Sequence, residues 1–289
     1  MFVHLRAHSC YSFLEGLATP AELVDAAAQR GMPALALTDH GGLTGAIEFF
    51  ESCRAAGIRS ILGLELDIAP PSDLLAEASH TRGNRLTLLA ADSTGWANLC
   101  RLSSLANASP SNWISNSLPF ESLAAHDTGL LCLTGSYRGL AYRLCANPDK
   151  SALQHWLQTL KQLFVDRLYI ELQHTPGGDN SRTTQLAVAA HRLGVATVAT
   201  HDIYYIKPEG ERLQRMISAI RLNSILSQLP ESAAALPGSY FTSAEEMEAR
   251  FSNYPQAIRS TGEIAERCQF ELPLGVPRFP EIDLPPGFA

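Results

Sequence analysis

The chain has 289 residues, of which 46% are hydrophobic, and its 22 Lys+Arg against 29 Asp+Glu give a net charge of −7. This length suits a large core, and no apolar run is long enough to span a bilayer. The acidic balance argues against a surface that binds DNA chiefly through phosphates. Without a secretory signal, we expect a cytoplasmic protein that does not bind membranes. The six cysteines form no C-x-x-C pair and are expected to be reduced.

Seven short apolar runs are expected to be strands, at residues 2–8, 33–39, 60–68, 85–91, 129–135, 167–172 and 194–200. Segments with helical periodicity lie between most of them, at residues 19–31, 45–57, 95–106 and 183–194. Strands that alternate with helices indicate a parallel sheet covered on its outer face, and seven such units predict a closed or nearly closed α/β barrel. Thr19, Pro20 and Glu22 form the pattern of a capping box at the start of the first helix.

The alternation of strands and helices ends after residue 206, so the barrel is expected to occupy residues 1–206. Residues 207–270 have helical patterns and are expected to form a helical extension of the barrel domain. Residues 271–289 are rich in proline, which cannot donate the backbone hydrogen bond that regular structure needs. We expect this segment to be a linker that leads to a further domain of a longer protein.

Histidines and carboxylates follow several of the predicted strands. In parallel barrels the active site lies at the carboxyl ends of the strands. Those ends carry His8, Asp39, His40, Glu65, the turn in the 90s, Ser136, Glu171, His174, His201 and Asp202. Glu65 is the most informative, because a carboxylate inside the apolar run ILGLELDI needs a cation or hydrogen-bond donors when it is buried. Asp39 has a simpler alternative role, which is to cap the turn before Gly41.

The first strand contains a conflicting signal. In VHLRAHSCYS, His4, Arg6 and His8 occupy alternate positions and therefore lie on one face of a strand. Two histidines at this spacing suggest a metal site, but a guanidinium stays protonated and cannot be a ligand. The chain has no G-x-S-x-G elbow, no P-loop and no G-x-G-x-x-G after a strand. The residues leave open whether the site performs metal chemistry or is the remnant of one that did.

The order of motifs resembles the N-terminal PHP (polymerase and histidinol phosphatase) domain of the bacterial DNA polymerase III alpha subunit. The matching stretches include HLRAHSCYSFLEG, ALALTDHGGLTGAIEF, ILGLEL, GWANLCRL, YIELQ, ATHDIYYI and the segment that ends in IAERCQFEL. The resemblance implies a distorted seven-stranded (β/α)7 barrel. Intact members of this family hold up to three metal ions, often zinc or manganese, and hydrolyse phosphoesters, some as 3′–5′ exonucleases.

The resemblance also assigns ligand positions. The positions that keep a ligand residue are His8, Glu15, His40, Glu65 and Asp202, and those that have lost one are Arg6, Arg85, Ser136 and Tyr204. The supporting residues are Asp39, Glu171, His174 and His201. Losing four of nine ligands should abolish a three-metal cluster. We therefore expect either no metal or a single weakly bound zinc or manganese, with Arg6 pairing with Glu65 and Asp202 in place of a cation.

The sequence thus predicts the PHP domain of a DNA polymerase III alpha-type polymerase that serves replication or repair. Its role would be structural, and no catalytic residue is expected within this segment. Magnesium and most DNA contacts would belong to the other polymerase domains, which are the expected partners together with the proofreading exonuclease subunit. Two alternatives remain: an active metal-dependent phosphoesterase or 3′–5′ exonuclease, and a free-standing binding module.

Overall fold

The computed structural model describes residues 1–74, 84–108, 117–174, 180–230, 233–275 and 277, so most of the predicted linker lies outside the described residues. The strands are β1 (Ala34–Leu37), β2 (Arg59–Ala69), β3 (Arg85–Ala90), β4 (Leu118–Pro119), β5 (Leu130–Leu133), β6 (Leu168–Gln173) and β7 (Ala196–Thr200). The α-helices are α1 (Pro20–Gln29), α2 (Ala46–Ala56), α4 (Ser93–Asn107), α5 (Phe120–Ala124), α6 (Leu140–Leu144), α7 (Ser151–Phe164), α8 (Ser181–Leu193), α9 (Gly210–Arg221), α10 (Ala244–Arg250) and α11 (Pro255–Arg267). Short 3-10 turns are η1 (Ser72–Leu74), η3 (Val165–Arg167) and η4 (Leu226–Gln228).

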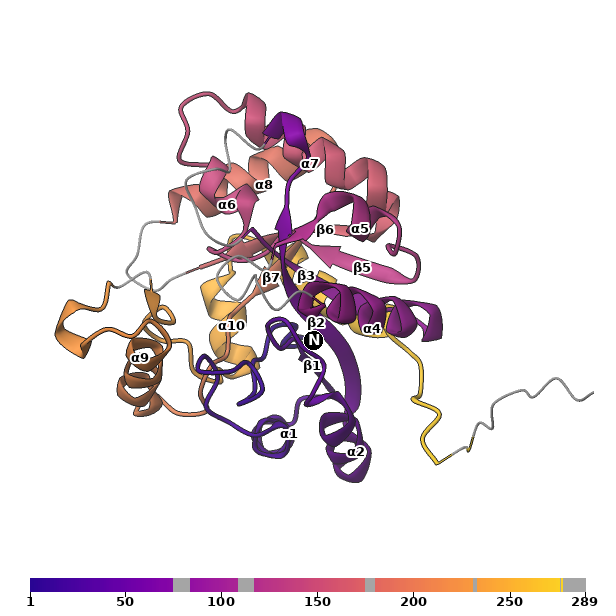
Figure 1. Cartoon of the computed structure of the whole chain (residues 1–289), viewed down its shortest axis with the longest axis vertical. Helices are drawn as coiled ribbons and strands as arrows, with labels where there is room; N and C mark the ends of the chain where they lie inside the picture. The colour runs from indigo at the N-terminus through magenta and orange to yellow at the C-terminus, as the bar shows by residue number, and fades with distance from the viewer. Residues whose placement is uncertain (75–83, 109–116, 175–179, 231–232, 276, 278–289) are drawn as a thin grey trace, which may run out of the picture.

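The strands form one curved sheet in the order β1-β2-β3-β5-β6-β7, with β4 paired to the end of β2 (Figure 1). The N-terminal segment closes this sheet into a barrel. His4 bridges Leu35 of β1, and Ala7 bridges Ile203 just beyond β7. The amide of His8 donates to the carbonyl of Ile203 at 2.9 Å. The predicted distorted α/β barrel is confirmed, with the first apolar run contributing bridges rather than a regular strand.

One strand runs against the expected direction. β3 is antiparallel to both β2 and β5, whereas β1–β2, β5–β6 and β6–β7 are parallel. A parallel neighbour requires a long crossover, usually a helix, and the described part of the β2–β3 connection contains only η1. The expectation of a wholly parallel sheet is therefore wrong. The turn in the 90s lies at the end of the barrel opposite to that predicted, where the amide of Ala91 donates to the carbonyl of Gly129 at 2.9 Å.

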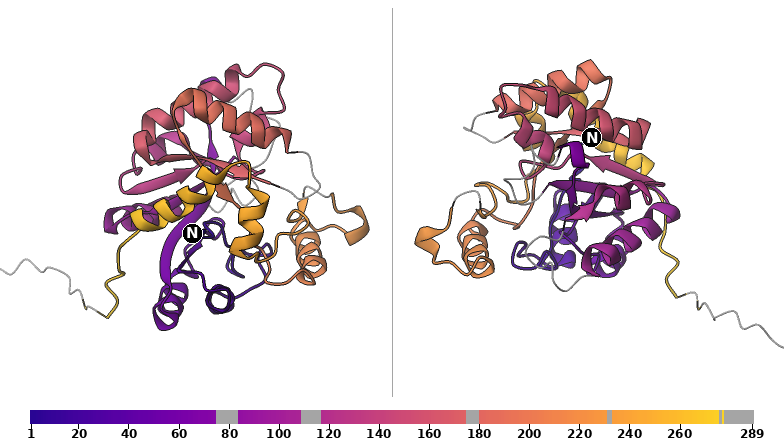
Figure 2. Two further views of the ribbon diagram at one scale, coloured as in Figure 1. Left: turned by 180° about the vertical axis from the view of Figure 1, so that it is seen from behind. Right: turned by 45° about the horizontal axis from the view of Figure 1, so that its top comes forward.

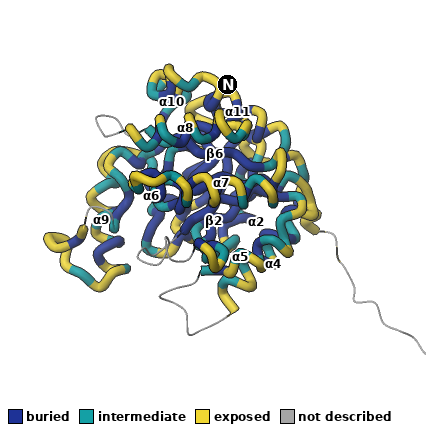
Figure 3. Tube along the Cα trace, turned by 90° about the horizontal axis from the view of Figure 1, so that it is seen from above, coloured by how far each residue is buried: buried dark blue, intermediate teal, exposed yellow. Residues whose placement is uncertain are grey.

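The end of the barrel interior at which most of the strands begin is apolar. The cluster that fills it consists of Val3, Leu5, Ala34, Ala36, Ile61, Leu89, Leu131, Leu133, Tyr169, Val198, Ile264, Ala265 and Cys268. Ile264 and Ala265 lie in α11, and Cys268 is its C-cap residue. This helix packs on β7 and covers the apolar end (Figure 2). Helices α1 and α2 pack together on one side of the barrel, and α7 and α8 lie over β5 and β6. The buried strands are thereby enclosed on nearly all sides (Figure 3).

The helix termini follow from local sequence. Thr19 Oγ1 accepts the amide of Glu22 at 3.2 Å, and the Glu22 carboxylate accepts the amide of Thr19 at 2.8 Å, which confirms the predicted capping box. Gly57 and Gly194 end α2 and α8 with φ of 68° and 62°, a left-handed conformation that favours glycine. In the described part of the chain, no helix combines the length and the apolar character needed to cross a membrane.

Candidate functional site

Two arginines meet at the polar end of the barrel, one on each side of a buried glutamate. Arg6 comes from the N-terminal segment and Arg85 is the first residue of β3. In the β2–β3 ladder Glu65 lies opposite Thr87, and Asp67 lies opposite Arg85. Because alternate residues of a strand share a face, both carboxylates and Arg85 point into the barrel. Arg6 donates to Glu65 Oε1, while Arg85 Nη1 donates to Oε2 at 2.6 Å.

Arg6 is fully buried, and each of its three guanidinium nitrogens donates at least one hydrogen bond. Its guanidinium donates to the side chains of Glu65, Thr87, Ser136 and Asp202. Its Nε also lies 3.6 Å from Glu171 Oε1. Burial disfavours the charge on Arg6, but the surrounding carboxylates outweigh this and raise its pKa well above the usual value. Arg6 is therefore a permanent internal cation.

Arg85 forms a second centre with Glu15. Its Nη1 and Nη2 donate to the two oxygens of Glu15 at 3.1 and 3.0 Å, the bidentate geometry that suits a guanidinium and a carboxylate. Arg138 Nη1 donates to the same carboxylate at 3.2 Å. Burial raises the pKa of Glu15, but Arg85, His40 and Arg138 together hold it well below its usual value. Glu15 is thus kept ionised by neighbouring cations.

His40 completes this second centre. Its Nδ1 lies 3.3 Å from Glu15 Oε1, and its Nε2 lies 3.1 Å from Asp67 Oδ2. Burial and Arg85 oppose a charge on the ring, but Glu15 and the hydrogen bond with Asp67 outweigh them and raise the pKa of His40 to about 9.

His8 and Tyr204 lie on the Arg6 side. His8 Nε2 lies 3.3 Å from Glu65 Oε2, and its ring stacks on the ring of Tyr204 with centroids 4.3 Å apart. Burial raises the pKa of Tyr204 well above its usual value, so its phenol stays neutral. Tyr204, at a position where the resemblance implies a lost histidine, therefore acts here as a packing surface for His8.

The five predicted ligand residues reach the same end of the barrel but do not converge on one point. Glu65, His8 and Asp202 surround Arg6, whereas Glu15 and His40 surround Arg85. Among the described residues, no group of three or more histidine, cysteine or acidic side chains could hold a metal ion. Guanidinium nitrogens lie at hydrogen-bond distance from the carboxylate oxygens that a metal would bind. The residues present do not fit a cluster of three metal ions.

Two supporting residues lie in or beside this network. Asp39 accepts hydrogen bonds from the amide and hydroxyl of Ser9, both at 2.7 Å, and from the hydroxyl of Ser12 at 2.6 Å. It therefore fixes the loop that leads to Glu15. Glu171 accepts a hydrogen bond from Thr200 at 3.0 Å. Burial raises the pKa of Glu171, Arg6 opposes this and Asp202 adds to it, and the net result is a pKa of about 7.

The other two supporting residues, His174 and His201, lie apart from the arginines. The ring of His201 bonds through Nε2 to the carbonyl of Tyr240 at 2.9 Å, and burial lowers its pKa to about 4. His174 and His201 line a cavity of about 30 Å³ together with Asp202 and Arg250. A space of this size corresponds to roughly one or two water molecules. The structure therefore places these histidines beside the site rather than in it.

Several residues of the network were not predicted from the sequence. Thr87 and Asp67 carry a usable signal, because each follows a site residue of its own strand by two positions and so shares its face. Arg138 follows the predicted Ser136 at the end of β5. Arg221 of α9, whose Nη1 lies 3.7 Å from Glu15 Oε1, carries no local signal, because only the tertiary fold brings it there.

The positive and negative groups of the network are equal in number at a pH between about 7, the pKa of Glu171, and about 9, the pKa of His40. Its positive groups are Arg6, Arg85, Arg138, Arg221 and the protonated His40. Its negative groups, when Glu171 is ionised, are Glu15, Glu65, Asp67, Glu171 and Asp202. Five positive groups thus face five carboxylates. Buried carboxylates require such partners, and here protein side chains supply them.

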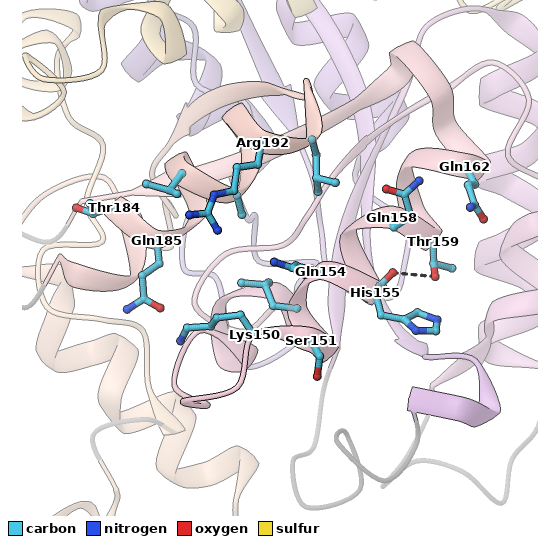
Figure 4. Close-up of a pocket in the computed structure, with 14 residues that line it drawn as sticks. Lys150, Ser151, Gln154, His155, Gln158, Thr159, Gln162, Thr184, Gln185 and Arg192 are labelled. Carbon is cyan, nitrogen blue, oxygen red and sulfur yellow. Dashed lines mark hydrogen bonds between the residues drawn. The ribbon is translucent and has the colours of Figure 1, made fainter.

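A separate groove lies away from the arginine network. It has a volume of about 710 Å³ and lies between α7 and α8 on the outside of the barrel (Figure 4). Lys150 and Arg192 flank it, Val188 and Leu153 contribute apolar surface, and no carboxylate lines it. The groove is therefore separate from the arginine network.

Comparison with known families decides the assignment. The family profile of the PHP domain matches residues 4–175, which contain both arginines and most of the network. The chain belongs to the PHP domain family. The DNA polymerase III subunit alpha of Treponema pallidum is 34% identical over all of this chain and 25% of its own length. An error-prone DNA polymerase of Mycobacterium bovis is 35% identical, over 99% of this chain and 26% of its own length.

The DNA polymerase III subunit alpha of Escherichia coli K12 is 34% identical over 98% of this chain and 24% of its own length. The chain thus spans about a quarter of the length of the curated relatives it matches. A solved structure from Bifidobacterium adolescentis, provisionally described as a metal-dependent phosphoesterase, has 12% identity and a TM-score of 0.46 over 87% of this chain and 95% of its own. A likeness at this level carries no functional argument.

Proposed function

We propose that this PHP domain forms part of a DNA polymerase III alpha-type DNA polymerase and that its metal site is degenerate. The observation that carries the second part is the pair of buried guanidinium groups on Glu65, one from Arg6 and one from Arg85. Each arginine stands where the family resemblance places a ligand histidine. Because neither can deprotonate, the domain keeps the carboxylates of a metal site and neutralises them with its own side chains. Its role is structural: it supports the other domains of a larger enzyme.

The first part of the proposal is supported by the relatives, whose printed names are those of DNA polymerases and which match along essentially all of this chain. The polymerase reaction, its magnesium ions and most DNA contacts would then belong to other domains, in the cytoplasm. The net charge of −7 fits a domain that is not the main DNA clamp. The groove between α7 and α8 offers surface for a partner such as a proofreading exonuclease subunit, because its flanking cations are matched by no carboxylate in its lining.

Metal analysis of protein purified without chelator and without a histidine tag tests the degenerate site. We expect less than about 0.1 equivalent of zinc or manganese, and a thermal melt that chelator leaves unchanged. One equivalent or more, with a melt lowered by chelator, would contradict the proposal. A matched variant that combines Arg6→His and Arg85→His restores two ligands, so its metal content should rise above that of the wild type.

A second candidate function is a weak single-metal phosphoesterase. The observation in its favour is that Glu171 Oε2 and Asp202 Oδ2 are buried and accept no hydrogen bond from any described residue. A divalent ion near them could activate a water molecule. This reading predicts metal-stimulated release of nucleotides from DNA that disappears in the Asp202→Ala variant. Release that is absent in the wild type at millimolar manganese would reject it.

A further inference from the structure

Helix α9 has the reverse of the usual arrangement of polar and apolar side chains. Gln214 and Ser218 are 1% and 0% exposed, whereas Leu213, Met216 and Ile220 are 52%, 46% and 66% exposed. The three exposed residues recur at i, i+3 and i+7, so they form one stripe on the helix. A surface helix normally buries such a stripe against the core.

The buried polar side of α9 holds the helix in this orientation. Gln214 Nε2 donates to the carbonyl of Glu15 at 3.2 Å and to the hydroxyl of Ser218 at 3.1 Å. Gln214 Oε1 accepts the amide of Ala235 at 3.1 Å. Rotating the apolar stripe inward would break these bonds and leave buried polar groups unpaired, which is unfavourable. The stripe is therefore fixed facing outward.

The exposed apolar surface continues beyond the helix. Leu222, Ile225 and Leu226 are 38%, 59% and 40% exposed. We call the six residues the outer apolar patch; its members are Leu213, Met216, Ile220, Leu222, Ile225 and Leu226. All six side chains are between 38% and 66% exposed, although they are large and apolar and lie within fourteen residues of one another in the chain. The α9 segment projects from the side of the barrel (Figures 1 and 3), and all six side chains of the patch are exposed.

The charges around the patch favour a second copy of the chain as its occupant. Two chains of net charge −7 repel each other, so a surface that is locally neutral is favourable for their association. No charged residue occurs from Leu222 to Leu229. At the start of α9, Glu209 and Glu211 are balanced by Arg212 and Arg215, four residues that line one shallow pocket with Leu226. A surface with both signs in equal number can pair with itself across a two-fold axis.

The apolar character of the patch also fits a pair of copies. In homodimers about 65% of the buried interface is apolar, more than on the rest of a protein surface. The six exposed apolar side chains of the outer apolar patch would supply part of that apolar share. We infer that the outer apolar patch is the interface through which two copies of this chain associate face to face. This inference does not depend on the proposed polymerase role.

Analytical ultracentrifugation of the 289-residue protein from about 1 to 200 µM tests it. We expect a reversible monomer–dimer equilibrium with a dissociation constant between about 1 and 100 µM. The variant Ile220→Glu places a buried like-charge pair in the interface and should weaken dimerisation at least about 30-fold. The milder Met216→Gln should weaken it about 3- to 10-fold, and serves if Ile220→Glu does not fold.

Val188→Glu on α8 and Ile47→Glu on α2 are matched controls, because both side chains are exposed to a similar extent and lie outside the patch. They should leave the dissociation constant unchanged. A protein that stays monomeric at every concentration would overturn the inference and assign the patch to a different polypeptide. A dimer that Val188→Glu disrupts and Ile220→Glu does not would overturn it as well.

Discussion

Replacing Arg6 by methionine tests whether the internal cations hold the barrel together. Methionine has a similar length, so the variant removes the charge and the hydrogen bonds with little change in volume. Among the described residues, Arg6 is the only ion-pair partner of Asp202 and of Glu171, while Glu65 keeps Arg85. The change therefore leaves Asp202 buried without a cation, whereas Glu171, whose pKa is already raised to about 7, takes up a proton. Breaking a buried pair in this way costs about 3–5 kcal/mol of unfolding free energy.

Urea unfolding at pH 7, followed by tryptophan fluorescence, measures this loss. Arg59→Met is the matched control, because Arg59 forms an ion pair with Glu266 that is largely exposed, with side chains 39% and 58% accessible. Its loss should cost less than about 1 kcal/mol. Adding Asp202→Asn to Arg6→Met should recover part of the stability, since an amide needs no counter-charge. A loss below about 1 kcal/mol for Arg6→Met, or one equal to the control, would refute the reasoning.

Three further measurements follow from the same contacts. Burial lowers the pKa of His4 to about 3 and that of His201 to about 4, so the unfolded chain binds more protons below pH 6.5. As the pH is lowered from 6.5 to 4, the free energy of unfolding should therefore decrease by about 1.4 kcal/mol per pH unit for each histidine. Urea titrations at several pH values can check this. Because the pKa of Glu171 is raised to about 7 in the folded protein, ionisation of this group destabilises the fold. The unfolding free energy of Glu171→Gln minus that of the wild type should therefore rise by roughly 2–3 kcal/mol between pH 4.5 and pH 8. A difference that does not change with pH would contradict this. A Cβ at Gly135 would lie 1.8 Å from the carbonyl at the start of β3, whereas one at Gly31 meets nothing within 4 Å, so Gly135→Ala should lower the thermal midpoint far more than Gly31→Ala, although both glycines have positive φ.

The positions of the buried strands could be predicted because a short run of apolar residues is by itself a local signal of a buried strand. The runs at 60–68 and 167–172 correspond to β2 and β6 within a residue or two, and most residues of both strands are buried. The capping box of α1 was predictable for the same reason, since its donors and acceptors lie within three residues. Direction in a sheet carries no such local signal. The antiparallel course of β3 therefore escaped prediction.

That reversal also decided the composition of the candidate site. An antiparallel β3 brings its first residue, Arg85, to the rim where the other strands end, opposite Asp67. The sequence marked Arg85 only through family resemblance, and it gave no sign of Arg138 or Arg221 as partners of Glu15. Contacts between residues far apart in the chain depend on strand order and helix placement. No local pattern encodes them.

By itself, the sequence determined the type of protein and the composition of the candidate site. It specified an α/β barrel with histidines and carboxylates at strand ends, and it placed Arg6, whose guanidinium stays protonated and cannot bind a metal, among them. Only the tertiary structure decided which cations neutralise the buried carboxylates: Arg6 and Arg85 contact the two oxygens of Glu65. It alone also showed that α9 turns its apolar side outward. The physical reason is the same in both cases: whether a charge is neutralised or an apolar side chain covered depends on which distant residues the fold brings next to it.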